Sequence, residues 1–167
     1  MGAHWEVHML TQEYVRELFD YRDGVLYWKV RRYKVTVGMT AGCLNKNNYM
    51  VVRIDYIRYQ NHRVIWLYHY GTFPAKIDHI NNISTDNMVE NLRPATTAEN
   101  NCNTLKRKNN KSGVKGVYWN KESSKWAAGI SKGGHRHHLG YFVTLSDAEA
   151  VVKSARMCLH GEFANHG

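Results

Sequence analysis

The chain has 167 residues, of which 43% are apolar, and its 23 Lys and Arg residues outnumber 14 Asp and Glu residues, for a formal net charge of +9. This length holds one ordinary domain or two small ones with packed cores. It contains no run of 18 apolar residues, which excludes a transmembrane helix and leads us to expect a soluble protein.

The positive charge is unevenly distributed along the chain. Residues 106–167 carry a net charge of +7, whereas residues 73–105 carry −2 and contain the adjacent pair Asp78 and His79. This distribution predicts a protein that binds a polyanion and has a cation-binding site within its acidic segment. If charge were the only signal, a generally basic soluble protein would be the favoured interpretation.

The cysteines and the N-terminal segment indicate where the protein resides. Cys43, Cys102 and Cys158 are far apart in sequence and form no CxxC pair. We therefore expect neither a disulfide framework nor a cysteine-based zinc site, and a reducing compartment. The first 14 residues show no signal-peptide pattern. The expected location is the cytoplasm, and the protein is not expected to be secreted.

The N-terminal region is predicted to be rich in β-structure. A short helix fits residues 11–20, with Thr11 as its cap, and β-rich segments follow at 24–30 and 48–61. Residues 62–70 end at Gly71 and fit a helix that starts behind an Asn61 cap. The same run is rich in strand-forming residues, so a strand remains an alternative.

The acidic segment is predicted to form a strand at 75–80, a polar loop at 81–88, a strand at 91–95 and then a helix. Thr96 and Glu99 have the spacing of a capping box at the start of that helix. Residues 105–111 are basic and almost free of large apolar side chains. We interpret them as a linker that can also touch phosphate.

The remainder of the chain, residues 112–167, has a different pattern. Three short apolar and aromatic runs separated by turn-forming clusters predict a three-stranded antiparallel sheet. Ser146, with Glu149 three residues later, is expected to open a helix that ends at Gly161. Its apolar stripe, predicted to face the core, comprises Ala148, Val151, Val152, Ala155 and Leu159. The fold class is therefore α+β.

The polar residues of the acidic segment have the chemistry of a hydrolytic site. Asp78 and Asn100 offer hard oxygen ligands suited to Mg²⁺ or Mn²⁺, with one ion expected per site. A neutral His79 beside that ion could accept a proton from water at physiological pH. Asn91 could orient the imidazole through a hydrogen bond. These groups together suit metal-assisted phosphodiester hydrolysis.

The segment from residue 62 to residue 103 resembles the HNH nuclease family, in the His-Asn-Asn form of phage and intron homing endonucleases. The matching blocks are His62-Arg63, Asp78 to Asn81, Asp86-Asn87, Glu90 to Arg93, and Glu99-Asn100. The resemblance implies a nuclease domain over residues 1–104, in which a β-rich region (residues 1–61) precedes a ββα-metal unit (residues 62–104). It also implies His79 as general base, Asn91 as the orienting residue, and Asp78 and Asn100 as metal ligands. The implied products carry 5′-phosphate and 3′-hydroxyl ends.

Residues 112–164 resemble the AP2 DNA-binding domain in the blocks SGVKGV, KWAAGI, LGYF and HGEFA. That family lays a three-stranded sheet in the DNA major groove. The resemblance implies contacts to DNA from Lys115, Tyr118, Lys125, Trp126 and Arg136. Tyr118 and Ser131 replace arginines that are usual in plant members, and His138 replaces a tryptophan, so the target sequence of those members cannot be transferred.

The combined interpretation is a strand-nicking DNA endonuclease of the homing type that binds double-stranded DNA as a monomer or a transient dimer. Arg63 and Arg93 are candidate phosphate contacts or simple surface charges. Two alternatives stay open. One is a non-catalytic DNA-binding regulator, and the other is a nuclease that nicks branched DNA according to its structure.

Overall fold

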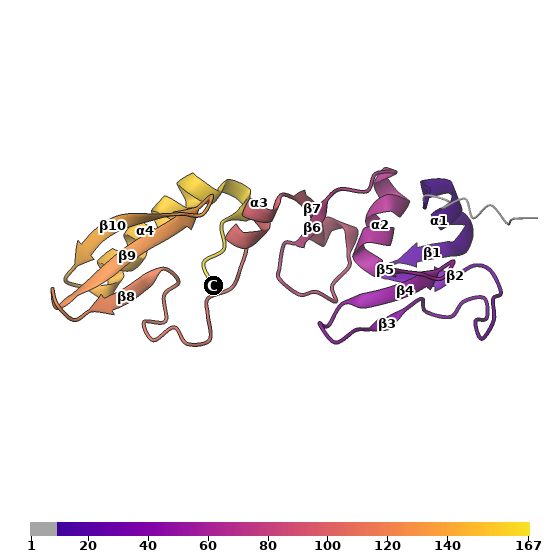
Figure 1. The fold of residues 1–167 in the computed structure, drawn as a ribbon, viewed down its shortest axis with the longest axis horizontal. Helices are drawn as coiled ribbons and strands as arrows, with labels where there is room; N and C mark the ends of the chain where they lie inside the picture. The colour runs from indigo at the N-terminus through magenta and orange to yellow at the C-terminus, as the bar shows by residue number, and fades with distance from the viewer. Residues whose placement is uncertain (1–9) are drawn as a thin grey trace, which may run out of the picture. The chain divides into compact units, whose positions relative to one another are not determined.

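The computed structural model describes residues 10–167, which divide into two compact units between Pro94 and Ala95. Each unit mixes helices with small antiparallel sheets, in agreement with the predicted α+β class (Figure 1). Among the described residues, no helix is long and apolar enough to cross a membrane.

From residue 10 onward, the first unit contains two α-helices and seven strands. In chain order these elements are α1 (Gln12–Leu18), β1 (Phe19–Arg22), β2 (Val25–Trp28), β3 (Cys43–Leu44), β4 (Met50–Ile54), β5 (Ile57–Gln60), α2 (Asn61–Tyr70), β6 (Lys76–His79), the 3₁₀ turn η1 (Val89–Asn91) and β7 (Leu92–Ala95). Ala95, the last residue of β7, is the first residue of the second unit.

Helix α1 begins as predicted, because the Thr11 side chain accepts a hydrogen bond from the backbone N–H of Tyr14 at 3.2 Å. The helix runs directly into the β1–β2 hairpin, in which Phe19 pairs with Trp28. Their ring centroids lie 4.4 Å apart, and both side chains are buried in the core of the unit.

The β-rich segment 48–61 is a hairpin followed by the start of α2. Strands β4 and β5 are joined by a two-residue turn at Asp55 and Tyr56, both of which have positive φ angles (45° and 69°). With β3 they form a three-stranded sheet in the order β3-β4-β5. Val52 and Ile54 on β4 are buried on one face of this sheet and contribute to the core.

Helix α2 confirms the helical alternative for residues 62–70. It begins one residue earlier than expected, because Asn61 is its first residue and not its cap. The buried Asn61 side chain instead donates to the carbonyl of Ala41 at 2.8 Å. Gly71 ends the helix in the left-handed conformation, as predicted. The helix packs against β4 and β5 (Figure 1).

The second unit contains α3 (Thr97–Cys102), β8 (Val117–Asn120), β9 (Lys125–Lys132), β10 (His135–Phe142), α4 (Leu145–His160) and the 3₁₀ turn η2 (Gly161–Phe163). The three strands form one antiparallel sheet in the order β10-β9-β8, and α4 packs against all three. Val117, Ala128, Ala148 and Val152 are buried between the sheet and the helix. The predicted capping box at Thr96 and Glu99 is present.

One predicted helix start in this unit is wrong. The N-cap of α4 is Thr144, not Ser146, and its side chain accepts from the backbone N–H of Asp147 at 3.1 Å. Both residue types are good caps. In addition to this backbone contact, the Thr144 hydroxyl donates a hydrogen bond to the Asp147 carboxylate at 2.7 Å. Arg156 is not part of the predicted apolar stripe of this helix, yet its side chain is also buried. Its guanidinium donates to the carbonyl of Lys115 at 2.7 Å.

The segment that follows α3 is bonded to the rest of the second unit. The ammonium group of Lys115 donates to the carbonyls of Cys102 (3.2 Å), Thr104 and Asn165 (3.0 Å). The Asn165 side chain also donates to that of Asn103 at 3.0 Å. The chain just after α3 is therefore anchored to the C-terminal end of the protein.

Candidate active site

Asp78 and His79 lie side by side at the end of β6, and both are buried, with 6% of each residue exposed. Adjacent residues of a strand point to opposite faces. Both faces of β6 must therefore be covered at this point, and polar groups on each face need partners there. The partners differ for the two residues.

The Asp78 carboxylate is paired with Arg93 on β7. Both Nε and Nη2 of Arg93 donate to Oδ2 of Asp78, at 3.0 and 2.8 Å. The side chains are only 7% and 12% exposed, so this is a mostly buried ion pair. Arg93 thus forms an ion pair with the predicted metal ligand Asp78. From the sequence, Arg93 was interpreted as a phosphate contact or a surface charge, and this pairing was not predicted.

The His79 imidazole is held by Asn87. Its Nε2 atom lies 3.0 Å from Oδ1 of Asn87, whose side chain is buried. An amide oxygen can only accept, so this hydrogen bond places the ring proton on Nε2. In the neutral ring the basic lone pair is then on Nδ1. Asn87 therefore fixes the tautomer that a general base requires.

Asn91, which the sequence predicts as the orienting residue, has a different role. Its side chain accepts from the backbone N–H of Asn81 at 3.0 Å, and it donates to Oδ1 of Asn81 at 3.0 Å and to the carbonyl of Asp86 at 2.8 Å. Asn91 closes the loop between β6 and β7. The amide that contacts the imidazole belongs to Asn87, which stands out in the sequence only as part of the matching block Asp86-Asn87.

The β1–β2 hairpin supports this loop from outside. A Cβ atom on Gly24, which has a φ of +80°, would lie 2.8 Å from the backbone nitrogen of Met88 and 3.0 Å from the carbonyl carbon of Asn87. The hydroxyl of Tyr21 accepts from the backbone N–H of Val89 at 3.0 Å. Sequence patterns gave no indication that these two residues position Asn87, because the contacts span more than 60 positions.

A second histidine packs against the imidazole. The ring of His62, on α2, lies 4.9 Å from the His79 ring at an interplanar angle of 76°, and the Tyr49 ring contacts both. Burial first, and then the nearby His79 and Arg63, lower the pKa of His62 to about 3. His62 is therefore neutral at physiological pH and forms an uncharged wall of the site.

The Arg63 side chain contacts the residues that directly precede β6. Its guanidinium donates to the carbonyls of Pro74 (2.9 Å) and Ala75 (3.2 Å) and lies over the ring of Phe73, 4.4 Å from its centroid. Its role as a phosphate contact stays a prediction. Asn100 lies on α3 in the second unit, and its role as a second metal ligand also stays a prediction.

The predicted DNA-contacting residues of the second unit fall into two groups. Strand register places Tyr118, Lys125 and Arg136 on the face of the sheet opposite α4, with Arg136 over the Tyr118 ring at 5.4 Å. Trp126 alternates to the other face, where it packs partly buried against the core. Lys115 is engaged by three backbone carbonyls.

Comparison with known proteins identifies the domain that contains this site. The family model described as HNH endonuclease matches residues 59–102, which include Asp78, His79, Asn87, Asn91 and Asn100. Protein 3.8 of Escherichia phage T7 is 33% identical over 107 residues, which cover 63% of this chain and 88% of that protein. The chain belongs to the family of this phage protein and carries an HNH endonuclease domain.

No solved structure matches the chain. The HNH domain suggests a DNA endonuclease and implies DNA as its substrate. Within residues 10–167, no group of three His, Cys, Asp or Glu side chains is placed to hold a metal ion.

Proposed function

We propose that this protein is a metal-dependent DNA endonuclease of the homing type, which nicks one strand and leaves 5′-phosphate and 3′-hydroxyl ends. The observation that carries the proposal is the His79 imidazole, buried beside Asp78 and fixed through Nε2 by Asn87. A single site per chain cuts a single strand. Cleavage of both strands would need a transient dimer or two successive events.

The chain's own residues supply the base and its orientation. His79 Nδ1 accepts a proton from the attacking water, and the hydrogen bond to Asn87 keeps the ring in the required tautomer and stabilises the imidazolium that forms. The neutral His62 ring adds no competing positive charge next to that imidazolium. The loop closed by Asn91 and backed by Gly24 keeps Asn87 in place.

Asp78 and Asn100 would hold the Mg²⁺ or Mn²⁺ ion. A carboxylate has about four lone-pair positions, so Asp78 can accept from Arg93 at Oδ2 and still ligate a cation. The hard oxygen donors fit Mg²⁺ or Mn²⁺ better than softer metals. Such an ion would supply stabilisation of charge on the phosphate oxygens.

Removing Arg93 provides a test of Asp78 as a ligand that does not depend on activity. Arg93→Gln leaves a buried carboxylate without its cation, so the free energy of unfolding is expected to fall by about 3 kcal/mol. Mg²⁺ should restore more stability to this variant than to the wild type, because the ion replaces the lost positive charge. Urea unfolding with and without Mg²⁺ measures both effects.

The double variant Arg93→Gln/Asp78→Asn is the control for that measurement. Without the carboxylate, the extra stabilisation by Mg²⁺ should disappear. An equal response to Mg²⁺ in the single and double variants would reject Asp78 as a ligand.

The second unit supports the proposal as an AP2-like reader of DNA sequence. Its exposed sheet face carries Tyr118, Lys125 and Arg136 opposite α4. The guanidinium of Arg136 lies across Gly129, which has no side chain to displace it. We keep these three residues as DNA contacts. Trp126 and Lys115 contribute instead to the core and to the anchoring of the chain after α3.

Point substitutions test this face better than truncation, because Asn103 and Thr104 are hydrogen-bonded to residues beyond the predicted linker. Arg136→Gln is expected to weaken DNA binding and to reduce the slope of log K against log salt by about 1, since one phosphate contact is lost. Lys153→Gln on α4 removes the same charge from a residue paired with Glu149 and should leave the slope unchanged. Equal slopes in both variants would contradict the reader assignment.

Cleavage of a randomised DNA library with Mg²⁺, followed by sequencing of the cut ends, tests the proposed activity directly. We expect nicks that carry 5′-phosphates and cluster at a preferred sequence. Binding without any cleavage would favour the non-catalytic regulator. Cleavage only at branched or distorted DNA would favour the structure-specific nuclease.

A further inference from the structure

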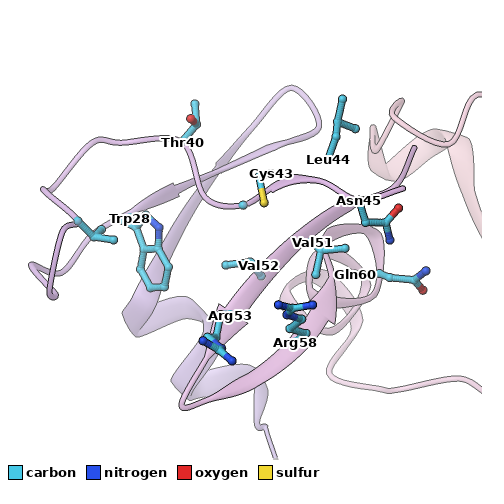
Figure 2. Close-up of a pocket in the computed structure, with 12 residues that line it drawn as sticks. Trp28, Thr40, Cys43, Leu44, Asn45, Val51, Val52, Arg53, Arg58 and Gln60 are labelled. Carbon is cyan, nitrogen blue, oxygen red and sulfur yellow. The ribbon is translucent and has the colours of Figure 1, made fainter. Parts of the chain in front are cut away.

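A groove of about 680 Å³ lies in the first unit, and neither His79 nor Asp78 is among its lining residues. It runs between the sheet β3–β5 and the chain around Trp28 and Thr40, as Figure 2 shows. Its lining residues are Trp28, Val35, Thr40, Gly42, Cys43, Leu44, Asn45, Val51, Val52, Arg53, Arg58 and Gln60. None of them is acidic.

Strand alternation places two arginines on the groove side of this sheet. Val52 and Ile54 on β4 point into the core, so Arg53 between them points to the opposite face. Arg58 on β5 is the direct cross-strand partner of Arg53 and shares that face. Figure 2 shows both guanidinium groups at the groove, one from each strand.

This pair is electrostatically unfavourable in the protein alone. Like charges directly opposite each other on neighbouring strands destabilise a sheet. In the described residues of the chain, neither guanidinium forms an ion pair. The nearby Asp55 is occupied, because it accepts from Tyr14 at 2.7 Å and from Arg32 at 3.1 Å. The groove therefore holds two positive charges that no acidic side chain balances.

We propose that this groove is a second DNA-binding surface, which holds the phosphodiester backbone of the duplex independently of the sheet β8–β10. Arg53 and Arg58 would contact neighbouring phosphates of the duplex. DNA is the polyanion that the HNH domain implies as substrate. The inference rests on the proposed function and adds to it a surface that contributes affinity without sequence preference.

Binding measurements in EDTA, where DNA is not cut, test the groove with the full-length protein. Arg53→Gln/Arg58→Gln is expected to weaken DNA binding and to reduce the slope of log K against log salt by about 2. The control Arg22→Gln/Lys29→Gln removes the same charge from exposed positions at the β1–β2 hairpin and should change the slope much less. The groove variant should be at least as resistant to heat as the wild type, because a like-charge pair is relieved.

Thiol alkylation at Cys43 gives a second, independent readout. Cys43 lines the groove and is exposed, while the exposed Cys158 on α4 serves as an internal reference. DNA in EDTA is expected to slow alkylation of Cys43 by iodoacetamide in the wild type. In the groove variant, DNA should slow the alkylation of Cys43 less than in the wild type when the same fraction of each protein is bound to DNA.

The outcomes separate the inference from the function on which it rests. Wild-type protein that binds and nicks DNA, together with a groove variant of unchanged affinity and salt slope and a Cys43 that DNA does not protect, would overturn the groove alone. Failure of the wild-type protein to bind DNA would overturn both. Loss of affinity to the same extent in the control pair would also reject the groove, since the effect would then be one of net charge.

Discussion

His79→Ala is expected to reduce Mg²⁺-dependent nicking by about 10²- to 10⁴-fold and to leave DNA affinity nearly unchanged. The imidazole is buried, 6% exposed, and fixed by Asn87, so it provides the proton acceptor but little binding surface. General-base catalysis contributes about 10²- to 10⁴-fold to a rate, and the variant should lose a factor in that range. Single-turnover nicking of plasmid DNA measures the rate, and binding in EDTA measures the affinity.

Imidazole added to the buffer supplies a control for that result. The substitution leaves space where the ring was, so free imidazole should restore some of the nicking in His79→Ala but not accelerate the wild type. His135→Ala, an exposed histidine on β10, should behave as the wild type. Nicking by His79→Ala at close to the wild-type rate would reject His79 as the base.

Asn87→Ala is expected to reduce the nicking rate by about 10- to 100-fold, the usual effect of removing a hydrogen-bonding partner of a functional histidine. The cause is loss of the bond that fixes the His79 tautomer. Asn91→Ala should act mainly on stability, because the Asn91 side chain bonds Asn81 and Asp86 within the loop between β6 and β7. Single-turnover rates and urea unfolding of the two variants separate these effects.

The variant Asn87→Asp adds a pH readout to this comparison. A carboxylate at Nε2 would place a negative charge beside the imidazole and favour its protonated form. The pH at which the nicking rate reaches half its maximum should therefore move upward. If Asn91→Ala lowered the rate without loss of stability while Asn87→Ala did not, Asn91 would be the orienting residue after all.

The sequence by itself determined the features that depend on residues close together in the chain. Thr11, Gly71 and the capping box of Thr96 and Glu99 begin or end helices where predicted, because each acts within a single helical turn. Asp78 and His79 were singled out in the same way, as neighbours within residues 59–102, the range that the HNH endonuclease model matches, and their roles stay predictions.

Local sequence patterns failed to predict one hairpin turn and one helix start. The turn at Asp55 and Tyr56 was not predicted, because two-residue hairpin turns with positive φ favour Asn or Gly, and a tyrosine gives no signal of one. Thr144 and Ser146 are both good N-caps and lie two residues apart. Which of them caps α4 depends on the path of the chain from β10 into the helix.

The tertiary structure alone decided which polar groups meet. Whether Asn87 or Asn91 reaches His79 depends on how the loop closes and on Gly24 and Tyr21, which are more than 60 residues away. The pairing of Asp78 with Arg93 likewise depends on β6 and β7 lying side by side. Hydrogen bonds and ion pairs act over about 3 Å in space, so the spacing of residues along the chain leaves their partners undetermined.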